Sequence, residues 1–182
     1  PAEVAATLLA CQSRIAGYDA SQRADGPTDF QAGTTAVVAL VVEADEEPAW
    51  LLANLGDSRA YRFSEGRLEQ VSVDHSLVQE LVSHGLITPA AAAVHPERHL
   101  VTRALRGTGS VEADYVVLPL SAAPRLVLCS DGVSDMIDDA RIEEIVAGAT
   151  DPRDAADALV GAAVAAGGRD NATAVVVDVV GL

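Results

Sequence analysis

Two acidic residues stand at the edges of apolar, strand-like runs and could bind a metal ion together. Asp131 follows the apolar run 125–129, and Asp170 precedes the apolar run 172–180. A carboxylate held at the end of a buried strand is costly to keep charged unless a cation lies beside it. Because Mg²⁺ and Mn²⁺ prefer carboxylate and water oxygens, the pattern favours a divalent-metal site and a metal-dependent hydrolase.

A third acidic turn has the same local pattern. Asp57 follows Gly56 in the stretch Asn54–Arg59, just as Asp131 precedes Gly132. A glycine beside the acid lets the backbone approach a ligand closely. Asp-Gly and Gly-Asp pairs are also ordinary turn residues, so each acid taken alone is typical of a turn, and both interpretations stay open at this point.

Composition and charge restrict the function classes. The chain has 182 residues, enough for one domain with its own core, and a net charge of −15, which argues against a nucleic acid or an anionic membrane as partner. Cys11 and Cys129 lie far apart and form no disulfide framework, and the apolar neighbours of Cys129 predict a buried thiol. With no apolar run of about 18 residues and no charged leader, we expect a cytoplasmic protein.

Apolar spacing predicts the elements that must position these acids. Helical spacing covers residues 3–18, followed by a polar loop from Asp19 to about Gln31. Further strands are expected at 34–43, 50–55, 59–63, 67–71, 114–118, 125–129 and 172–179, and further helices near 77–82, 88–93, 138–146 and 151–166. Strands in blocks and helices in blocks indicate an α+β fold rather than a repeating parallel sheet.

Four motifs in order carry a family resemblance. They are Gly33-Thr34-Thr35-Ala36, Gly56-Asp57-Ser58-Arg59-Ala60-Tyr61, Cys129-Ser130-Asp131-Gly132-Val133-Ser134-Asp135 and Arg169-Asp170-Asn171-Ala172-Thr173. This set resembles the metal-dependent Ser/Thr protein phosphatases of type 2C, the PPM family. Asp74-His75-Ser76 and the stretch around His95-Pro96 are similar to the bacterial members.

The resemblance implies an α+β fold, a four-layer α-β-β-α sandwich with two stacked antiparallel sheets. It implies two core Mn²⁺ or Mg²⁺ ions with Asp131 and Asp170 among their ligands. It also matches Asp57 to a possible third, weaker metal site that Asp131 would share. The chain would form a single phosphatase-like catalytic domain over 1–182, with a flap at about 74–106.

The chemistry implied is hydrolysis of phosphoserine or phosphothreonine in proteins by a metal-bound water, without a protein nucleophile. We expect phosphorylated proteins and Ser/Thr protein kinases as partners. Ser58, Ser130 and Ser134 are then expected to hold turns or to support the metal ligands from behind. His75 is expected to be a solvated loop residue, and a position near the site is the alternative.

The sequence also departs from the family pattern. The motif Asp-Gly-x-Gly-Gly, which supplies the aspartate that bridges the two core metals, does not occur in these residues. We therefore expect N-terminal strands of the family fold to be missing from this chain. A catalytically silent phosphatase-like domain that acts as a regulatory binding module is the alternative interpretation.

Overall fold

The computed structural model of the chain describes residues 1–181. The described residues fold into two compact units. The first unit consists of Pro1–Ala36, Ala53–Asp57 and Asp74–Tyr115, and the second of Val37–Leu52, Ser58–Val73 and Val116–Leu182.

Most of the strands lie wholly or mainly in the second unit. They are β2 (Ala36–Ala44), β3 (Glu47–Leu55), β4 (Arg59–Ser64), β5 (Arg67–Gln70), β7 (Asp114–Pro119), β8 (Arg125–Cys129) and β9 (Ala174–Asp178). Its helices are η1 (Leu120–Ala122), α4 (Asp131–Ser134), α5 (Asp139–Gly148) and α6 (Pro152–Ala165). The strands form a three-stranded sheet in the order β2-β3-β7 and a four-stranded sheet in the order β5-β4-β8-β9.

Strand β8 lies between β4 and β9, and both pairings are antiparallel. Cys129, the last residue of β8, is opposite Arg59 on one side and Ala174 on the other. This register brings the end of β8, the start of β4 and the start of β9 to the same edge of the sheet. The acidic segments that follow β8 and precede β9 therefore begin side by side.

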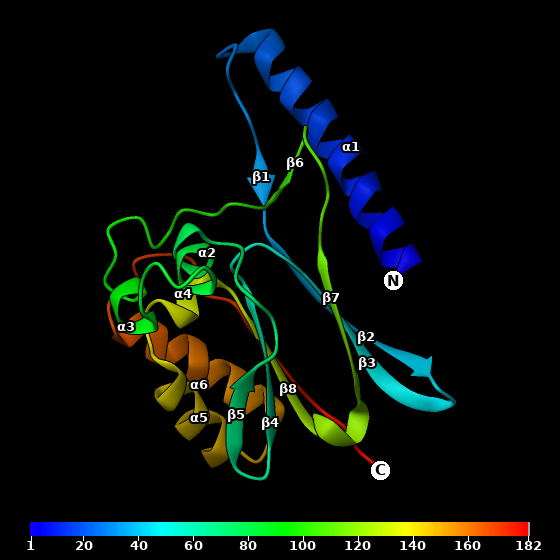
Figure 1. Ribbon diagram of the computed structural model, residues 1–182, viewed down its shortest axis with the longest axis vertical. Helices are drawn as coiled ribbons and strands as arrows, with labels where there is room; N and C mark the ends of the chain where they lie inside the picture. Colours follow the sequence, from blue (N-terminus) through cyan, green and yellow to red (C-terminus); the bar gives the residue numbers. More distant parts are fainter. Residues whose placement is uncertain (182) are drawn as a thin grey trace. The chain divides into compact units, whose positions relative to one another are not determined.

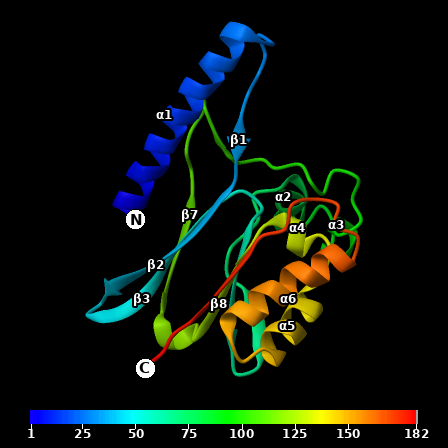
Figure 2. The same ribbon diagram turned by 180° about the vertical axis from the view of Figure 1, so that it is seen from behind.

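Alternation along β8 explains why this strand is apolar throughout. Val127 belongs to the core that the four-stranded sheet forms with α4, α5 and α6, whereas Leu126 belongs to the core shared with the three-stranded sheet. Neighbouring residues of a strand face opposite sides of its sheet, so both faces of β8 are buried. Helices α5 and α6 lie over one face of this sheet (Figures 1 and 2). Cys129 is 3% exposed, which confirms the buried thiol.

The second core joins the two sheets. Trp50 on β3 packs with Ala60 and Leu126 of the four-stranded sheet. Its indole Nε1 donates to the carbonyl oxygen of Ala123 at 3.1 Å, which satisfies the one polar atom of this buried ring. The prediction of an α+β fold with stacked antiparallel sheets is confirmed.

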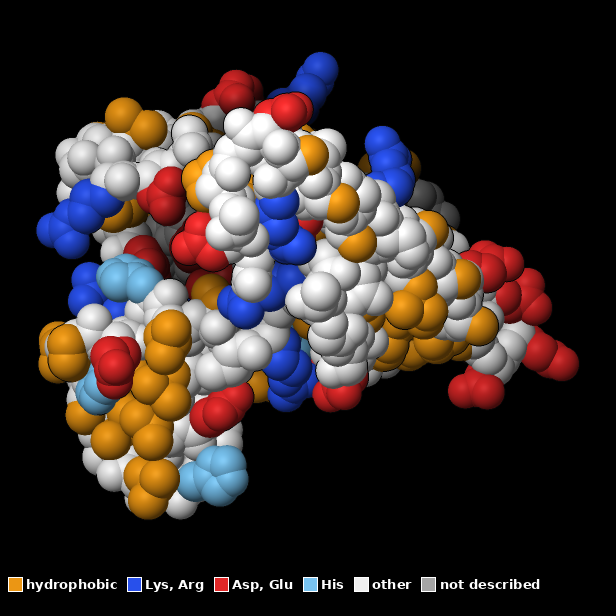
Figure 3. Space-filling view, turned by 90° about the horizontal axis from the view of Figure 1, so that it is seen from above, with side chains coloured by type: hydrophobic (Ala, Val, Ile, Leu, Met, Phe, Trp, Pro, Cys, Tyr) orange, Lys and Arg blue, Asp and Glu red, His pale blue; other side chains and the backbone are white. Residues whose placement is uncertain are grey.

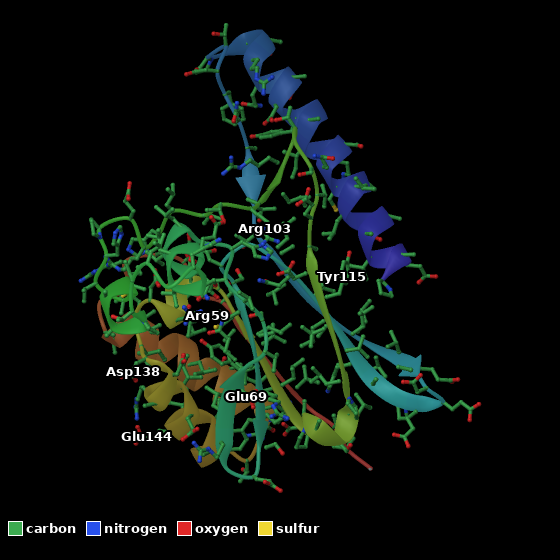
Figure 4. The ribbon with its side chains drawn as sticks, viewed as in Figure 1. Arg59, Glu69, Arg103, Tyr115, Asp138 and Glu144 are labelled. Atoms are coloured by element: carbon green, nitrogen blue, oxygen red, sulfur yellow. The ribbon has the colours of Figure 1, made fainter. Side chains whose placement is uncertain are left out.

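Two helices of this unit begin at capping aspartates. The side chain of Asp138 accepts from the backbone N–H of Arg141 at the start of α5 (Figure 4). Asp151 accepts from the N–H of Arg153 at the start of α6, where Pro152 occupies the first turn. Such caps satisfy N–H groups that have no partner within the helix.

The turn between β4 and β5 contains two residues with positive φ. Glu65 and Gly66 have φ values of 54° and 78°, which are left-handed conformations suited to a tight hairpin. The turn between β2 and β3 uses Asp45 and Glu46, with φ values of 52° and 66°. Neither residue is glycine, so this second turn carries no glycine signal in the sequence.

The first unit contains helices α1 (Ala2–Asp25), α2 (Leu77–Ser83) and α3 (Pro89–Ala92), and the short strands β1 (Gly33–Thr34) and β6 (Leu105–Arg106). β1 and β6 pair antiparallel.

Within residues 1–181, no helix combines the length and the apolar character that a membrane span requires. On the face shown in Figure 3, acidic side chains lie in several groups rather than in one patch.

The predicted end of the first helix is wrong, because α1 continues through the expected polar loop to Asp25. Asp19 is only 3% exposed, and its Oδ1 accepts from the N–H of Ala32 at 2.7 Å. One turn further on, Nε of Arg23 donates to the carbonyl oxygen of Phe30 at 2.7 Å. From their places on the helix these polar side chains hydrogen-bond to the backbone of the segment that follows. Hydrophobic spacing does not indicate such bonds.

Replacing Tyr61 by Phe tests the link between β4 and α5. The buried hydroxyl of Tyr61 donates to Asp139 at 3.0 Å and accepts from Arg59 at 3.2 Å, and burial raises the pKa of this phenol. We expect Tyr61→Phe to lower the free energy of unfolding by about 1 kcal/mol, because the partly exposed partners regain water. Urea denaturation measures this change. Tyr18→Phe, at a half-exposed ring, is the control and should leave stability unchanged.

The carboxyl of Asp151 provides a test by pH. Hydrogen bonds from the side chain and backbone of Arg153 lower its pKa from 3.8 to about 2. Because the pKa is lower in the folded state, the stabilisation is present above the unfolded pKa and is lost as pH falls through about 2. Carboxyl ¹³C NMR should show this midpoint, and Arg153→Gln should move it toward 3.8. A midpoint near 3.8 in the unchanged protein, or an equal shift in Arg141→Gln, contradicts the interpretation.

Candidate metal site

Asp131 and Asp170 lie on segments that meet at one edge of the four-stranded sheet. The backbone N–H of Ser130 donates to the carbonyl oxygen of Thr173 at 3.0 Å, and the N–H of Thr173 donates to Oγ of Ser130, also at 3.0 Å. These bonds continue the pairing of β8 with β9 beyond the last ladder pair. The structure therefore brings together the two acidic segments that the sequence predicts to act together.

Gly132 makes this close approach possible. A Cβ atom at this position would lie 2.2 Å from the carbonyl oxygen of Asn171 and 3.2 Å from Cα of Ala172. No side chain fits at such distances without moving the backbone of one segment. The glycine after Asp131 is thus required by the packing of the two segments, beyond its usual use in turns.

Each carboxylate is oriented by the backbone that follows it. Oδ1 of Asp131 accepts from the N–H of Gly132 at 2.8 Å, and Oδ1 of Asp170 accepts from the N–H of Asn171 at 2.7 Å. Asp131 is half-buried and Asp170 is exposed. The expectation that burial itself demands a cation is therefore wrong for Asp170, although its oxygens remain suitable ligands for a hard divalent ion.

The donor set that these residues provide is incomplete. Within residues 1–181, no group of three His, Cys, Asp or Glu side chains is arranged to hold a metal ion. The sheet edge supplies two carboxylates of the right chemical type, and both follow from the pairing of β8 with β9. They fit part of the ligand set of a divalent-metal centre.

The turn that carries Asp57 belongs to the first unit and has its own packing requirement. Gly56 has a φ of 121°, and a Cβ atom there would lie 2.3 Å from the Thr35 methyl carbon. The Asn54 side-chain amide donates to the carbonyl oxygen of Gly56 at 3.1 Å. Only glycine fits both the conformation and the contact. The glycine before Asp57 is therefore required by the packing of this turn.

The prediction that His75 is a solvated loop residue is wrong. His75 is 2% exposed, and its Nδ1 accepts from the backbone N–H of Gly56 at 3.1 Å. Its Nε2 lies 3.1 Å from Oδ2 of Asp114. These partners are 19 and 39 residues away, so no local pattern could indicate the burial. The only signal in the sequence is the family resemblance of Asp74-His75-Ser76.

Asp114 is charged where it meets His75. Partial burial alone raises the pKa of Asp114, but the hydrogen bond with His75 and the guanidinium of Arg103 outweigh it and lower the pKa below its ordinary value. Nη1 of Arg103 lies 3.1 Å from Oδ1 of Asp114, and Figure 4 shows Arg103 on the segment before β6. The carboxylate thus accepts from two sides.

Comparison with known proteins shows which protein family this chain resembles. The sequence profile described as Protein phosphatase 2C matches residues 4–81. The serine/threonine phosphatase stp of Listeria innocua is 37% identical over 146 residues, which are 80% of this chain and 56% of that protein.

Solved structures extend the likeness over nearly the whole chain. The serine/threonine phosphatase Stp1 from Staphylococcus aureus matches with a TM-score of 0.84 and 30% identity, covering 98% of this chain and 67% of that one. The chain belongs to the protein phosphatase 2C family. The catalytic domain of the phosphatase PstP in complex with two manganese ions also matches, with a TM-score of 0.75, 34% identity, and coverage of 93% of this chain and 67% of that one.

The family assignment made from the four ordered motifs is therefore confirmed. The chain spans little more than half the length of its Listeria relative. Asp131, Asp170 and Asp57 remain predicted metal ligands of this phosphatase 2C chain.

Replacing Gly132 by Ala tests the packing at the sheet edge. The added methyl group would overlap the carbonyl oxygen of Asn171, so we expect a loss of about 1–3 kcal/mol in the free energy of unfolding. Gly161→Ala is the matched control, because Gly161 lies inside α6 with open space around it and should gain about 0.5–1 kcal/mol. Equal effects of the two substitutions, measured by urea denaturation, contradict the assigned contact.

Proposed function

We propose that this protein hydrolyses phosphoserine and phosphothreonine in proteins, using a divalent metal ion and water. The observation that carries the proposal is the meeting of the Asp131 and Asp170 segments at one sheet edge, in a chain of the phosphatase 2C family. The named relatives are serine/threonine phosphatases, which supports the substrate class.

Asp131 and Asp170 are proposed as ligands of Mn²⁺ or Mg²⁺. A bound divalent ion at such a site lowers the pKa of its water and neutralises charge on phosphoryl oxygens. The two carboxylates contribute fixed negative charge, and the bonds from Gly132 and Asn171 hold their orientation. Asp57 is proposed to bind a further, weaker ion. The manganese ions of the PstP domain support the choice of metal.

The serine beside Asp131 does not serve as a nucleophile in this proposal. Oγ of Ser130 accepts from the N–H of Thr173 at 3.0 Å and donates to the carbonyl oxygen of Asn171 at 3.4 Å. Both bonds tie the β8 end to the segment that carries Asp170. Ser130 therefore holds the two ligand segments together, and the attacking oxygen comes from water.

The biological setting follows from this activity. We propose phosphorylated proteins as substrates, Ser/Thr protein kinases as the opposing enzymes, and the cytoplasm as the location. The net charge of −15 supports a protein substrate over a nucleic acid, since polyanions repel such a chain. Nothing among the described residues favours the silent binding module over the enzyme.

Metal binding tests the ligand assignment. We expect Asp131→Asn and Asp170→Asn each to lower Mn²⁺ affinity by about 100-fold or more, because loss of a direct ligand exceeds the 10–100-fold typical of groups behind the ligands. Isothermal titration calorimetry at fixed pH and salt measures this. Asp157→Asn on α6 removes the same charge from an exposed site and should bind Mn²⁺ as the unchanged protein does. Equal affinity in all of them would contradict the assignment.

Phosphate release tests the reaction itself. Incubation with a phosphothreonine peptide should release phosphate when Mn²⁺ is present and stop on addition of a chelator. Asp170→Asn should abolish the release while Asp157→Asn retains it. Mn²⁺ binding without any release of phosphate would instead support the silent domain.

A further inference from the structure

His75 joins three separate segments of the first unit. Its main-chain N–H donates to the carbonyl oxygen of Gly56 at 2.9 Å, and its carbonyl oxygen accepts from the N–H of Thr102 at 2.8 Å. Its ring contacts Gly56 on one side and Asp114 on the other. A buried residue with this set of partners fixes the spacing of all three segments.

The donors and acceptors determine the state of the imidazole. The group facing Nδ1 is the backbone N–H of Gly56, which can only donate, so Nδ1 carries no proton. The group facing Nε2 is the carboxylate of Asp114, which accepts, so Nε2 carries the proton. The ring is therefore the neutral Nε2–H tautomer, and Arg103 supplies the positive charge beside Asp114.

Gly56 is bonded to His75 through both of its peptide groups: its N–H donates to Nδ1, and its carbonyl oxygen accepts from the His75 main-chain N–H. The next residue is Asp57. The turn Asn54–Asp57 is thus held on one side by the Thr35 methyl group and on the other by the imidazole. Both contacts are made at Gly56, and they set the backbone from which the Asp57 carboxylate projects. The orientation of this carboxylate depends on the Gly56 peptide.

We propose that His75 is a positioning residue that sets the Asp57 carboxylate for metal binding by accepting the Gly56 N–H at Nδ1. The inference rests on the proposed function, in which Asp57 binds the weaker ion. Asp114 and Arg103 support this role of His75. The Asp114 carboxylate holds the proton on Nε2, so that Nδ1 can accept, and Arg103 contacts the same carboxylate. Residues behind a ligand act on a metal in this indirect way.

Two substitutions distinguish the roles of the two ring nitrogens. His75→Asn places an amide oxygen near the position of Nδ1, which can still accept the Gly56 N–H but cannot reach Asp114. His75→Gln places an amide nitrogen near the position of Nε2, which can still donate to Asp114 but leaves Gly56 without its acceptor. Both variants remove the same ring and one ring hydrogen bond, so they are matched in what a merely structural role would lose.

Hydrogen exchange of the Gly56 amide and Mn²⁺ titration are the two measurements. In His75→Gln we expect Gly56 exchange to become at least about 10-fold faster and the weaker Mn²⁺ affinity to fall about 10-fold. His75→Asn should stay within about 3-fold of the unchanged protein in both. Equal changes in the two variants, or a larger change in His75→Asn, overturn the proposal.

The unchanged protein supplies a measurement that needs no variant. Long-range ¹⁵N–¹H spectra of the imidazole at pH 7 should show a proton on Nε2 and none on Nδ1. A proton on Nδ1 overturns the proposal even where both variants fail to fold. If the unchanged protein binds no Mn²⁺, the proposed function of Asp57 fails, and Gly56 exchange still decides whether His75 holds the turn.

Discussion

The antiparallel pairing of β8 with β4 and β9 is the constraint on which the second unit depends. β8 is buried on both faces, so one strand joins the core under the helices to the core between the sheets. The same pairing fixes where the chain leaves the sheet, at Cys129 opposite Ala174. A shift of one residue would turn every side chain of β8 to the other face and exchange the residues that fill the two cores. Hydrophobic packing thus sets the position of Asp131 and Asp170, although neither belongs to a core.

Close backbone contacts then refine the two acidic turns. Gly132 lies against the Asn171 carbonyl, and Gly56 lies against Thr35, and in both cases a Cβ atom would overlap its neighbour. The glycine beside each acid therefore serves a contact between segments. In the first unit the imidazole of His75 adds a directional bond to this contact. Polar bonds and steric limits act on backbone atoms here, and the carboxylates follow from the backbone.

Local sequence patterns predicted most helices and strands, and particular residues show where such patterns no longer predict the structure. The caps Asp138 and Asp151 and the apolar runs of the strands act over a few residues, so the sequence indicates them directly. The predicted end of α1 was wrong because Asp19 and Arg23 lie in the helix and bond to residues 32 and 30. Hydrophobic spacing does not indicate such bonds. The burial of His75 was missed for the same reason, since its partners are 19 and 39 residues away.

The sequence by itself determined the family, through four motifs in order, and the pair of acids at the strand edges. It determined these because apolar alternation and turn residues are local properties that one-dimensional order preserves. Only the tertiary structure decided that Asp170 is exposed, that Gly132 touches Asn171, and that His75 is a buried neutral imidazole bound to Gly56. Those facts depend on which segments pack together, and pairing energies between distant segments leave no period in the sequence.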